Sequence, residues 1–150
     1  MAKINVDLIR KLREQTGAPV IRVQKVLVEV DGNEAKAKAI LTREGFEKVA
    51  KREGRTTAQG KLFTYLHHTG KVASVAELLC ETDFVARNEL FEALGKDVAM
   101  QIASMGEKDI LEQEFIKDPS KKISDLVKEV IVKTGENVRI GRVIRVELNG

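Results

Sequence analysis

The sequence predicts an α+β protein, in which three short helices form an N-terminal module and a three-stranded antiparallel sheet packed against helices forms the core. Two observations support this prediction. Up to about residue 45, apolar residues recur at helical spacings between turn residues. From residue 62 onward, two short apolar runs flank a turn, and an alternating segment follows two further helical patterns. Helices that cover antiparallel strands make an α+β core.

The first predicted helix covers residues 4–15. Ile4, Leu8 and Leu12 lie four residues apart, so they form one apolar stripe of an amphipathic helix. Thr16-Gly17 ends this helix, because glycine can adopt the left-handed conformation of a helix C-terminus.

The second and third helices are predicted from their start signals and their apolar stripes. Pro19 suits the first turn of the second helix, and Asn33 is an N-cap for the third. We expect Gly45 to end the third helix. The apolar residues assigned to these two helices are Val23, Val26, Leu27, Val30, Ala35, Ala39, Ile40 and Leu41.

A bundle of three helices in about 45 residues has too small an interior to bury all of its apolar side chains. Val20 and Ile21 are consecutive at a helix start, so they cannot both face inward, and at least one is left for a partner. We therefore interpret residues 1–55 as a docking module. Its candidate contact residues are Leu12, Val20 and Ile21.

Residues 46–60 are polar and include two glycines, which predicts a fraying helical tail and a linker. The core then covers residues 56–150. Its first two strands are predicted at Leu62–Leu66 and at Val72–Leu79, joined by the turn Thr69-Gly70-Lys71. These strands form a β-hairpin.

Two helical patterns follow the hairpin. The first runs to about Met105 and has one apolar face made of Phe91, Leu94, Val98 and Ile102. We expect the second helix to begin at Pro119 and to stop near Gly135. Its apolar residues are Ile123, Leu126, Val127, Val130 and Ile131.

The last segment, residues 138–148, alternates and predicts a third strand. One face carries Val138, Ile140, Arg142, Ile144 and Val146. The other carries Arg139, Gly141, Val143, Arg145 and Glu147. An uncovered edge strand with apolar residues on both faces favours association of two copies, unless charges blunt the edge. The three arginines of this strand could do so, and both outcomes remain open.

Composition excludes several classes of protein. No apolar run approaches the ~18 residues of a membrane span, and the N-terminus lacks the apolar core of a signal peptide. Cys80 is the only cysteine, which suits a reducing cytoplasm, and no Cys/His cluster has metal-ligand spacing. His67 and His68 are adjacent, so in a strand they point to opposite faces. We therefore expect a cytoplasmic protein without a metal or another cofactor.

The net charge of +3 is concentrated in residues 1–60, which hold 13 Lys or Arg against 8 Asp or Glu. A basic segment could contact nucleic acid or an acidic protein surface. It lacks the interleaved aromatics of a single-strand binder and any run of five like charges. We expect no direct nucleic-acid binding. An RNA-associated translation protein remains the rival hypothesis, and steep salt dependence of RNA binding would support it.

Residues 80–89 join the second strand to the following helix and contain the motif Thr82-Asp83-Phe84-Val85-Ala86-Arg87-Asn88. This contiguous motif resembles the signature of the elongation factor Ts family. Residues 12–19, the pattern of Tyr65, His67, Gly70 and Lys71, and Gly135-Glu136-Asn137 resemble the same family. The chain departs from it in the second helix, where many members have an acidic-Cys-Lys-Lys-Ala-Leu run and this chain has residues 22–27, Arg-Val-Gln-Lys-Val-Leu.

The resemblance implies a translation elongation factor that acts in protein biosynthesis and is not an enzyme. Members of the family bind elongation factor Tu with GDP and promote GDP release by disturbing the Mg²⁺ and phosphate site. The N-terminal module would be similar to a ubiquitin-associated (UBA-like) domain. The implied partner-binding residues are Thr82, Asp83, Phe84 and Val85. Longer members carry two related core subdomains, so a homodimer is implied for a chain with one.

Spacing alone allows other interpretations of the motif. Phe84 lies seven residues before Phe91, so in an unbroken helix it would share the core-facing stripe. The resemblance instead implies an exposed wedge on a helix that kinks before Asn88. Asp83 and Arg87 can form an ordinary helical pair. No nucleophile lies at a catalytic spacing from a base, and Cys80 is interpreted as a packed residue.

Overall fold

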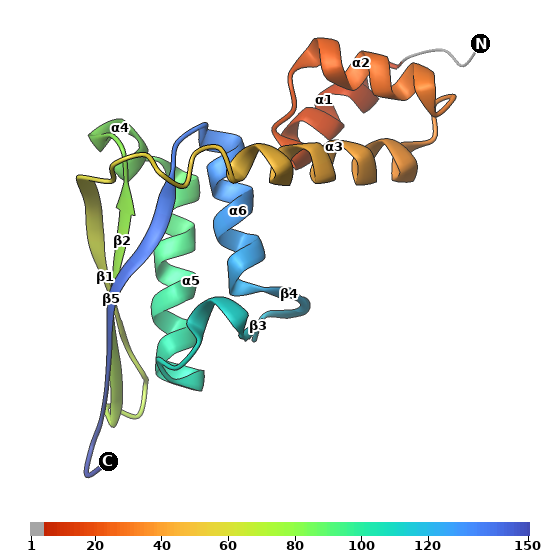
Figure 1. Cartoon of the computed structure of the whole chain (residues 1–150). Helices are drawn as coiled ribbons and strands as arrows, with labels where there is room; N and C mark the ends of the chain where they lie inside the picture. The colour runs from red at the N-terminus through yellow and green to blue at the C-terminus, as the bar shows by residue number, and fades with distance from the viewer. Residues whose placement is uncertain (1–4) are drawn as a thin grey trace. The chain divides into compact units, whose positions relative to one another are not determined.

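The computed structural model describes residues 5–150, so Ile4 of the first predicted stripe lies outside the described residues. The chain divides into two compact units (Figure 1). The helical unit comprises residues 5–54 with Val132–Gly135, and the core unit comprises Arg55–Ile131 with Glu136–Gly150. The prediction of a mixed fold with a three-stranded antiparallel sheet is confirmed.

The helical unit contains α1 (Val6–Thr16), α2 (Val20–Glu29) and α3 (Glu34–Val49). Gly17 ends α1 in the left-handed conformation, with φ of 73°, and its N–H donates to the Arg13 carbonyl. The Asn33 side chain caps α3 by accepting from the Lys36 N–H at 3.0 Å. The buried core of the unit consists of Ile9, Leu12, Val23, Val26, Leu27, Ala37 and Leu41.

Helix α3 differs from its prediction in length and in its buried face. Gly45 does not end the helix, which continues to Val49. Burial of the Val49 side chain stabilises this extra turn. The inward positions are Ala37 and Leu41, four residues apart, whereas Ala35 and Ala39 are exposed. The alanines at neighbouring positions look alike in sequence, so only packing decides which of them face the core.

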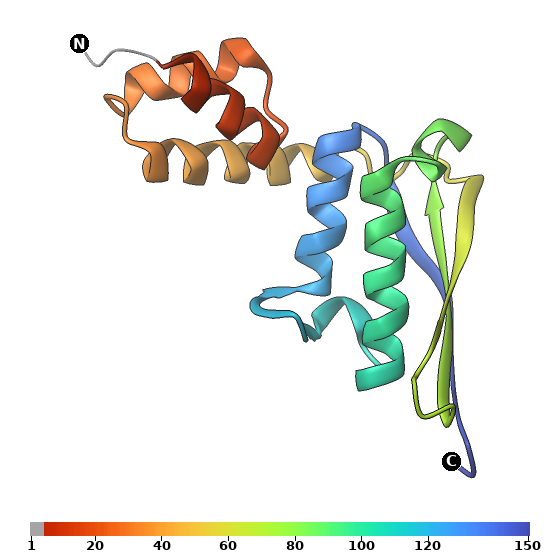
Figure 2. The same ribbon diagram turned by 180° about the vertical axis from the view of Figure 1, so that it is seen from behind.

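The core unit is built on a sheet of strand order β1-β2-β5, with β1 at Gln59–Leu66, β2 at Val72–Cys80 and β5 at Val138–Glu147. Both neighbouring pairs are antiparallel. Helix α5 (Glu89–Met105) packs on one face, and α6 (Ile123–Thr134) lies beside α5 in both views (Figures 1 and 2). No helix of the described core unit covers the opposite face of the sheet (Figure 2).

The interface between the sheet and α5 depends on a glycine. Phe63 of β1 and Phe91 of α5 are buried, and their ring centroids are 6.1 Å apart. A Cβ atom on Gly95 would lie 2.2 Å from two carbons of the Phe63 ring. Gly95 therefore lets the ring of Phe63 rest directly on the backbone of the helix.

We expect Gly95→Ala to lower the free energy of unfolding, although alanine has the higher helix propensity. Propensity would contribute about 1 kcal/mol in favour of alanine. Overpacking against a ring that cannot move aside costs about 1–3 kcal/mol or more. Urea denaturation of the variant and the wild type measures the sign. A more stable variant would show that the Phe63 ring can shift.

Strand β5 contains a β-bulge that reverses the predicted faces of the residues after it. Ala76 pairs with Val143 but Leu78 pairs with Ile140, so β5 has one more residue than β2 between the two pairs. At the bulge the Arg142 N–H and guanidinium both donate to the Glu77 carboxylate, at 3.2 and 3.1 Å. The prediction that Val138, Ile140, Ile144 and Val146 share one face is therefore wrong.

Beyond the bulge, Val143 and Arg145 point toward α5, and the guanidinium of Arg145 donates to the Ala103 carbonyl at 2.9 Å. Ile144 and Val146 lie on the uncovered face instead. A single inserted residue changes the side of every residue after it, because the side-chain period of a strand is two.

The segment between α5 and α6 also differs from its prediction. Pro119 does not begin a helix: it lies in β4 (Asp118–Lys122), which pairs with β3 (Glu114–Phe115) after a short 3₁₀ turn, η1 (Ile110–Glu112). Helix α6 begins only at Ile123, where the Asp125 carboxylate accepts from the Lys122 N–H at 2.9 Å. Proline also fits an edge strand, since such a strand leaves the N–H position of the proline unpaired.

Candidate functional site

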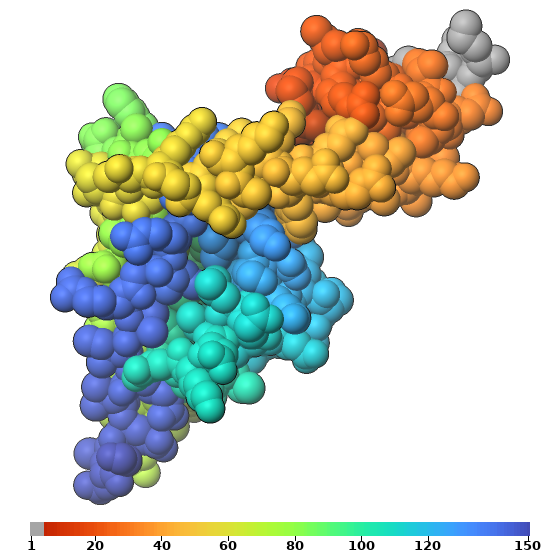
Figure 3. Space-filling view, in the orientation of Figure 1, coloured from red at the N-terminus to blue at the C-terminus, as the bar shows by residue number. Residues whose placement is uncertain are grey.

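The segment after β2 forms a short exposed helix, α4 (Asp83–Ala86), which we call the tip. Thr82 is its N-cap: its backbone is extended and its hydroxyl accepts from the Val85 N–H at 3.4 Å. Val85 and Ala86 are buried on one side of this single turn. Phe84 therefore points away from the core and is 76% exposed. The green α4 segment lies at the surface in Figure 3.

A break between two helices separates Phe84 from the core stripe of Phe91. Helix α4 ends at Ala86, and α5 begins at Glu89 with the Asn88 side chain capping the Leu90 N–H at 2.8 Å. The spacing of seven residues therefore does not place both rings on one face. The helical pattern predicted to run from the motif to Met105 is two helices, and Phe84 is free for a partner.

Asp83 and Arg87 flank the exposed ring. The Arg87 guanidinium lies 3.0 Å from the Asp83 carboxylate and 5.7 Å from the centroid of Phe84. Both charged side chains are more than half exposed. Such surface contacts contribute only ~0.2–1 kcal/mol each, so a partner can displace them. The tip thus presents an aromatic ring beside a carboxylate that can be released.

The tip is attached to the end of the sheet by carboxylates. Glu136, in the loop before β5, accepts from the Thr82 N–H at 3.0 Å and from the Thr82 hydroxyl at 2.6 Å. Glu81 accepts from the Asn137 N–H at 2.6 Å. Sequence reasoning missed the contact of Glu136, which is 54 residues from Thr82, because no local spacing joins the two.

Cys80 is fully buried beneath the tip, and its thiol donates to the Thr82 carbonyl at 3.1 Å. Burial raises the pKa of this thiol, so it stays protonated at neutral pH and is a packed residue. Among residues 5–150, no group of three or more His, Cys, Asp or Glu side chains could hold a metal ion. None of the helices in that range is long and apolar enough to cross a membrane.

The three candidate docking residues have different positions in the helical unit. Ile21 is 68% exposed and Val20 is 37% exposed, whereas Leu12 is fully buried. Leu12 belongs to the core of the unit because it lies on the inward stripe of α1, so it offers no surface to a partner. Val28, which we did not select from the sequence, is also well exposed. It follows Ile21 by seven residues, so both lie on one side of α2.

The part of α2 that departs from the family pattern makes a contact within the helical unit. The Arg22 guanidinium binds both oxygens of the Glu44 carboxylate on α3, with the Nε contact at 2.8 Å. These hydrogen bonds hold the pKa of Glu44 below its usual range. Arg22 therefore joins α2 to α3 and is occupied within the unit.

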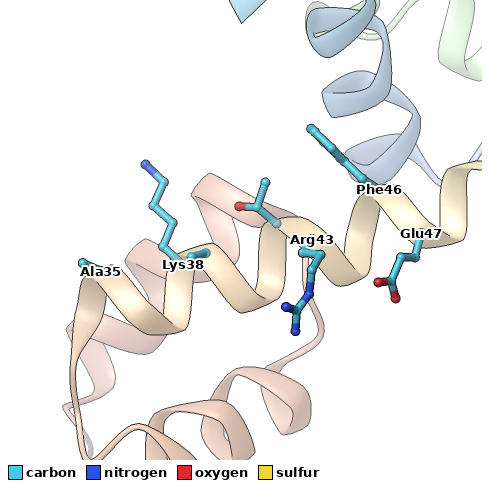
Figure 4. A pocket seen from close by; sticks show the side chains of 7 residues that line it. Ala35, Lys38, Arg43, Phe46 and Glu47 are labelled. Carbon is cyan, nitrogen blue, oxygen red and sulfur yellow. The ribbon is translucent and has the colours of Figure 1, made fainter. Parts of the chain in front are cut away.

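A shallow depression runs along the outward side of α3 (Figure 4). Exposed Ala35 and Ala39 contribute to it, together with Lys38 and Arg43. Its lining is completed by Thr42, Phe46 and Glu47.

The similarity to known proteins covers almost the whole chain. Residues 81–150 match the family model for elongation factor TS. A protein of Leptospira biflexa named Elongation factor Ts is 36% identical over 195 residues, covering 98% of both chains. The protein of that name from Thermotoga maritima is 34% identical over 192 residues, covering 97% of this chain and 96% of the relative. These aligned lengths exceed the 150 residues of this chain, so the relatives have residues opposite gaps in it.

Proposed function

The chain belongs to the elongation factor Ts family, and from this premise we propose that it is a guanine nucleotide exchange factor, and not an enzyme, that binds elongation factor Tu. The observation that supports this proposal is the exposed ring of Phe84 on a turn whose other side is buried. An exposed aromatic residue on an anchored turn can enter a partner without unfolding its own protein. Such a translation factor would act in the cytoplasm.

The proposed mechanism is displacement of the Mg²⁺ site of the partner. Phe84 would insert between two elements of the GTPase and shift the groups that hold the ion. Mg²⁺ demands near-ideal octahedral geometry, so a small shift weakens its binding. Asp83 would bring a carboxylate to the same place once its contact with Arg87 opens. The GDP phosphates would then lose their counter-charge and leave faster.

Linkage requires the reverse effect as well. If the factor weakens GDP binding by the GTPase, then GDP weakens binding of the factor by the same ratio. Release of fluorescently labelled GDP from elongation factor Tu, with and without this protein, tests the proposal. We expect faster release that saturates as the protein concentration rises. An unchanged rate at saturating protein would refute the exchange function.

We propose that the helical unit is a UBA-like docking arm whose contact surface includes Val20, Ile21 and Val28 on α2. All three are exposed apolar residues of one short helix. Exposed apolar residues gathered on one element are typical of a protein-binding surface. Leu12 is not part of this surface, since it lies in the core.

We expect Ile21→Ser to raise the protein concentration needed for half-maximal exchange about tenfold, with the maximal rate unchanged. The substitution removes a side chain that docks but leaves the tip intact. Val6→Ser is the matched control, because Val6 is also 68% exposed but lies on α1. Equal half-maximal concentrations for Ile21→Ser and the wild type would refute the docking surface.

We further propose that two copies associate through the uncovered face of the sheet and not only through the edge of β5. Five apolar residues there are more than half exposed: Leu62, Leu66, Ile144, Val146 and Leu148. Below the yellow segment, much of strand β5 is visible at the surface in Figure 3. Burial of such a face by a second copy removes apolar surface from water on both sides of a two-fold axis.

We expect sedimentation equilibrium at micromolar concentration to give twice the 16.7 kDa mass of one chain. Val146→Lys should shift the equilibrium toward the monomer, because it places a charge in the apolar face. Lys108→Glu, a charge change outside this face, is the control. A wild-type mass that stays at 16.7 kDa would contradict the dimer in that range.

A further inference from the structure

We infer that Glu136 is a positioning residue for the tip: its carboxylate fixes the start of α4 and thereby the direction in which Phe84 points. This inference deepens the proposed exchange function and rests on it. Glu136 lies in the core unit, in the loop between α6 and β5. It acts through Thr82, with which it forms two hydrogen bonds.

The contact between Glu136 and Thr82 lies just beyond the last backbone pair of β2 with β5. The final pair of β2 with β5 is Cys80 with Val138. Continuing this register would place Glu81 opposite Asn137 and Thr82 opposite Glu136. Here side-chain carboxylates accept the backbone hydrogen bonds: Glu136 accepts from the Thr82 N–H, and Glu81 accepts from the Asn137 N–H. The two carboxylates thus extend the connection between the chain segments beyond the last backbone pair.

The second hydrogen bond of Glu136 reaches the cap of α4. One carboxylate oxygen accepts the Thr82 hydroxyl at 2.6 Å, and the same hydroxyl oxygen accepts the Val85 N–H at 3.4 Å. Glu136 therefore fixes the Thr82 side chain in the rotamer that caps the helix. Hydrogen bonds to a carboxylate are stronger than those between neutral groups. The contact of Glu136 with Thr82 therefore stabilises the start of the four-residue helix α4.

Asn137, on the other side of this connection, is also held in place. The Asn137 side chain is almost fully buried and donates to the Arg55 carbonyl at 3.0 Å. The Arg55 guanidinium lies 3.6 Å from the Glu81 carboxylate. Because Asn137 is held from a third segment, its neighbour Glu136 is presented to Thr82 from a constrained loop. This loop therefore sets the direction in which the single turn of α4 presents the exposed ring of Phe84.

The test separates positioning from general stability by two readouts. The first is the maximal rate of GDP release at saturating protein, and the second is hydrogen–deuterium exchange of backbone amides in the free protein. We expect Glu136→Ala to lower the maximal rate about tenfold with little change in the half-maximal concentration. The amides of Thr82 and Val85 should exchange faster, while those in the middle of α5 stay protected.

Conservative variants and a control complete the design. Glu136→Gln keeps one acceptor oxygen, so its maximal rate should lie between those of Glu136→Ala and the wild type. Thr82→Val, which keeps the backbone N–H but removes the hydroxyl donor, should lower the maximal rate in the same direction as Glu136→Ala. Glu112→Ala, which removes the carboxylate of a surface pair with Lys122, should leave both readouts unchanged.

The outcomes distinguish this inference from the exchange function. If the wild type does not accelerate GDP release, the proposed function fails, and amide exchange alone decides whether Glu136 orders the tip. A wild-type maximal rate or wild-type tip amides in Glu136→Ala would overturn the positioning role. Loss of protection throughout α5 in that variant would also overturn it, because the residue would then support the whole core.

Discussion

Replacing Phe84 with alanine is expected to reduce the acceleration of GDP release from elongation factor Tu about 100-fold, the size of a strong interface hot spot. The ring is 76% exposed in the free protein, so it has little role in folding. We therefore expect the free energy of unfolding to change by less than about 0.5 kcal/mol. Stopped-flow release of labelled GDP and urea denaturation of the same variant measure the two quantities.

Leu111→Ala is the matched control for this variant. Leu111 is also an exposed apolar residue of the core unit, but it lies in η1 and not at the tip. It should change neither exchange nor stability. Full exchange activity of Phe84→Ala would show that the tip does not act as a wedge, and a large loss of stability would show that the ring is packed in solution.

Replacing Phe91 with alanine is expected to have the opposite effect, a loss of about 3–5 kcal/mol in the free energy of unfolding. Phe91 has no exposed surface and packs against Phe63 between α5 and the sheet. Truncation leaves a cavity that the neighbouring strands can fill only in part. Because folded domains are stable by only about 5–15 kcal/mol, the thermal unfolding midpoint should fall by many degrees.

The companion measurement for Phe91 is exchange activity at a temperature where the variant remains folded. There, the maximal rate should stay closer to the wild type than that of Phe84→Ala, because the tip is unchanged. Phe91→Leu, which keeps most of the apolar volume, should lose less stability than Phe91→Ala. A Phe91→Ala variant as stable as the wild type would contradict the packing of α5 on the sheet.

These two phenylalanines show where local sequence information ends. They are seven residues apart, and on spacing alone both would lie on one helical face. The turn at Arg87 and the extended backbone of Asn88 separate them. Asn88 is a recognisable N-cap, so the break has a local signal, but a cap residue within a helical pattern does not by itself interrupt a helix.

Local sequence signals were sufficient to predict the elements whose signals lie within a few residues of one another. Gly17 ends α1, Asn33 caps α3, and the hairpin turns at Thr69-Gly70-Lys71 between β1 and β2. Each of these depends on backbone conformation or on a hydrogen bond that spans at most four residues. The motif that begins at Thr82 was also recognisable, because it is contiguous.

Features that depend on contacts between distant residues could be identified only in the folded structure. The bulge of β5 is set by pairing with Glu77, 65 residues before Arg142, and it decides that Ile144 and Val146 face outward. Glu136 meets Thr82 across 54 residues. Burial of Leu12 likewise follows from packing among three helices. In each case the energy comes from groups brought together by the fold, and spacing along the chain carries no record of that proximity.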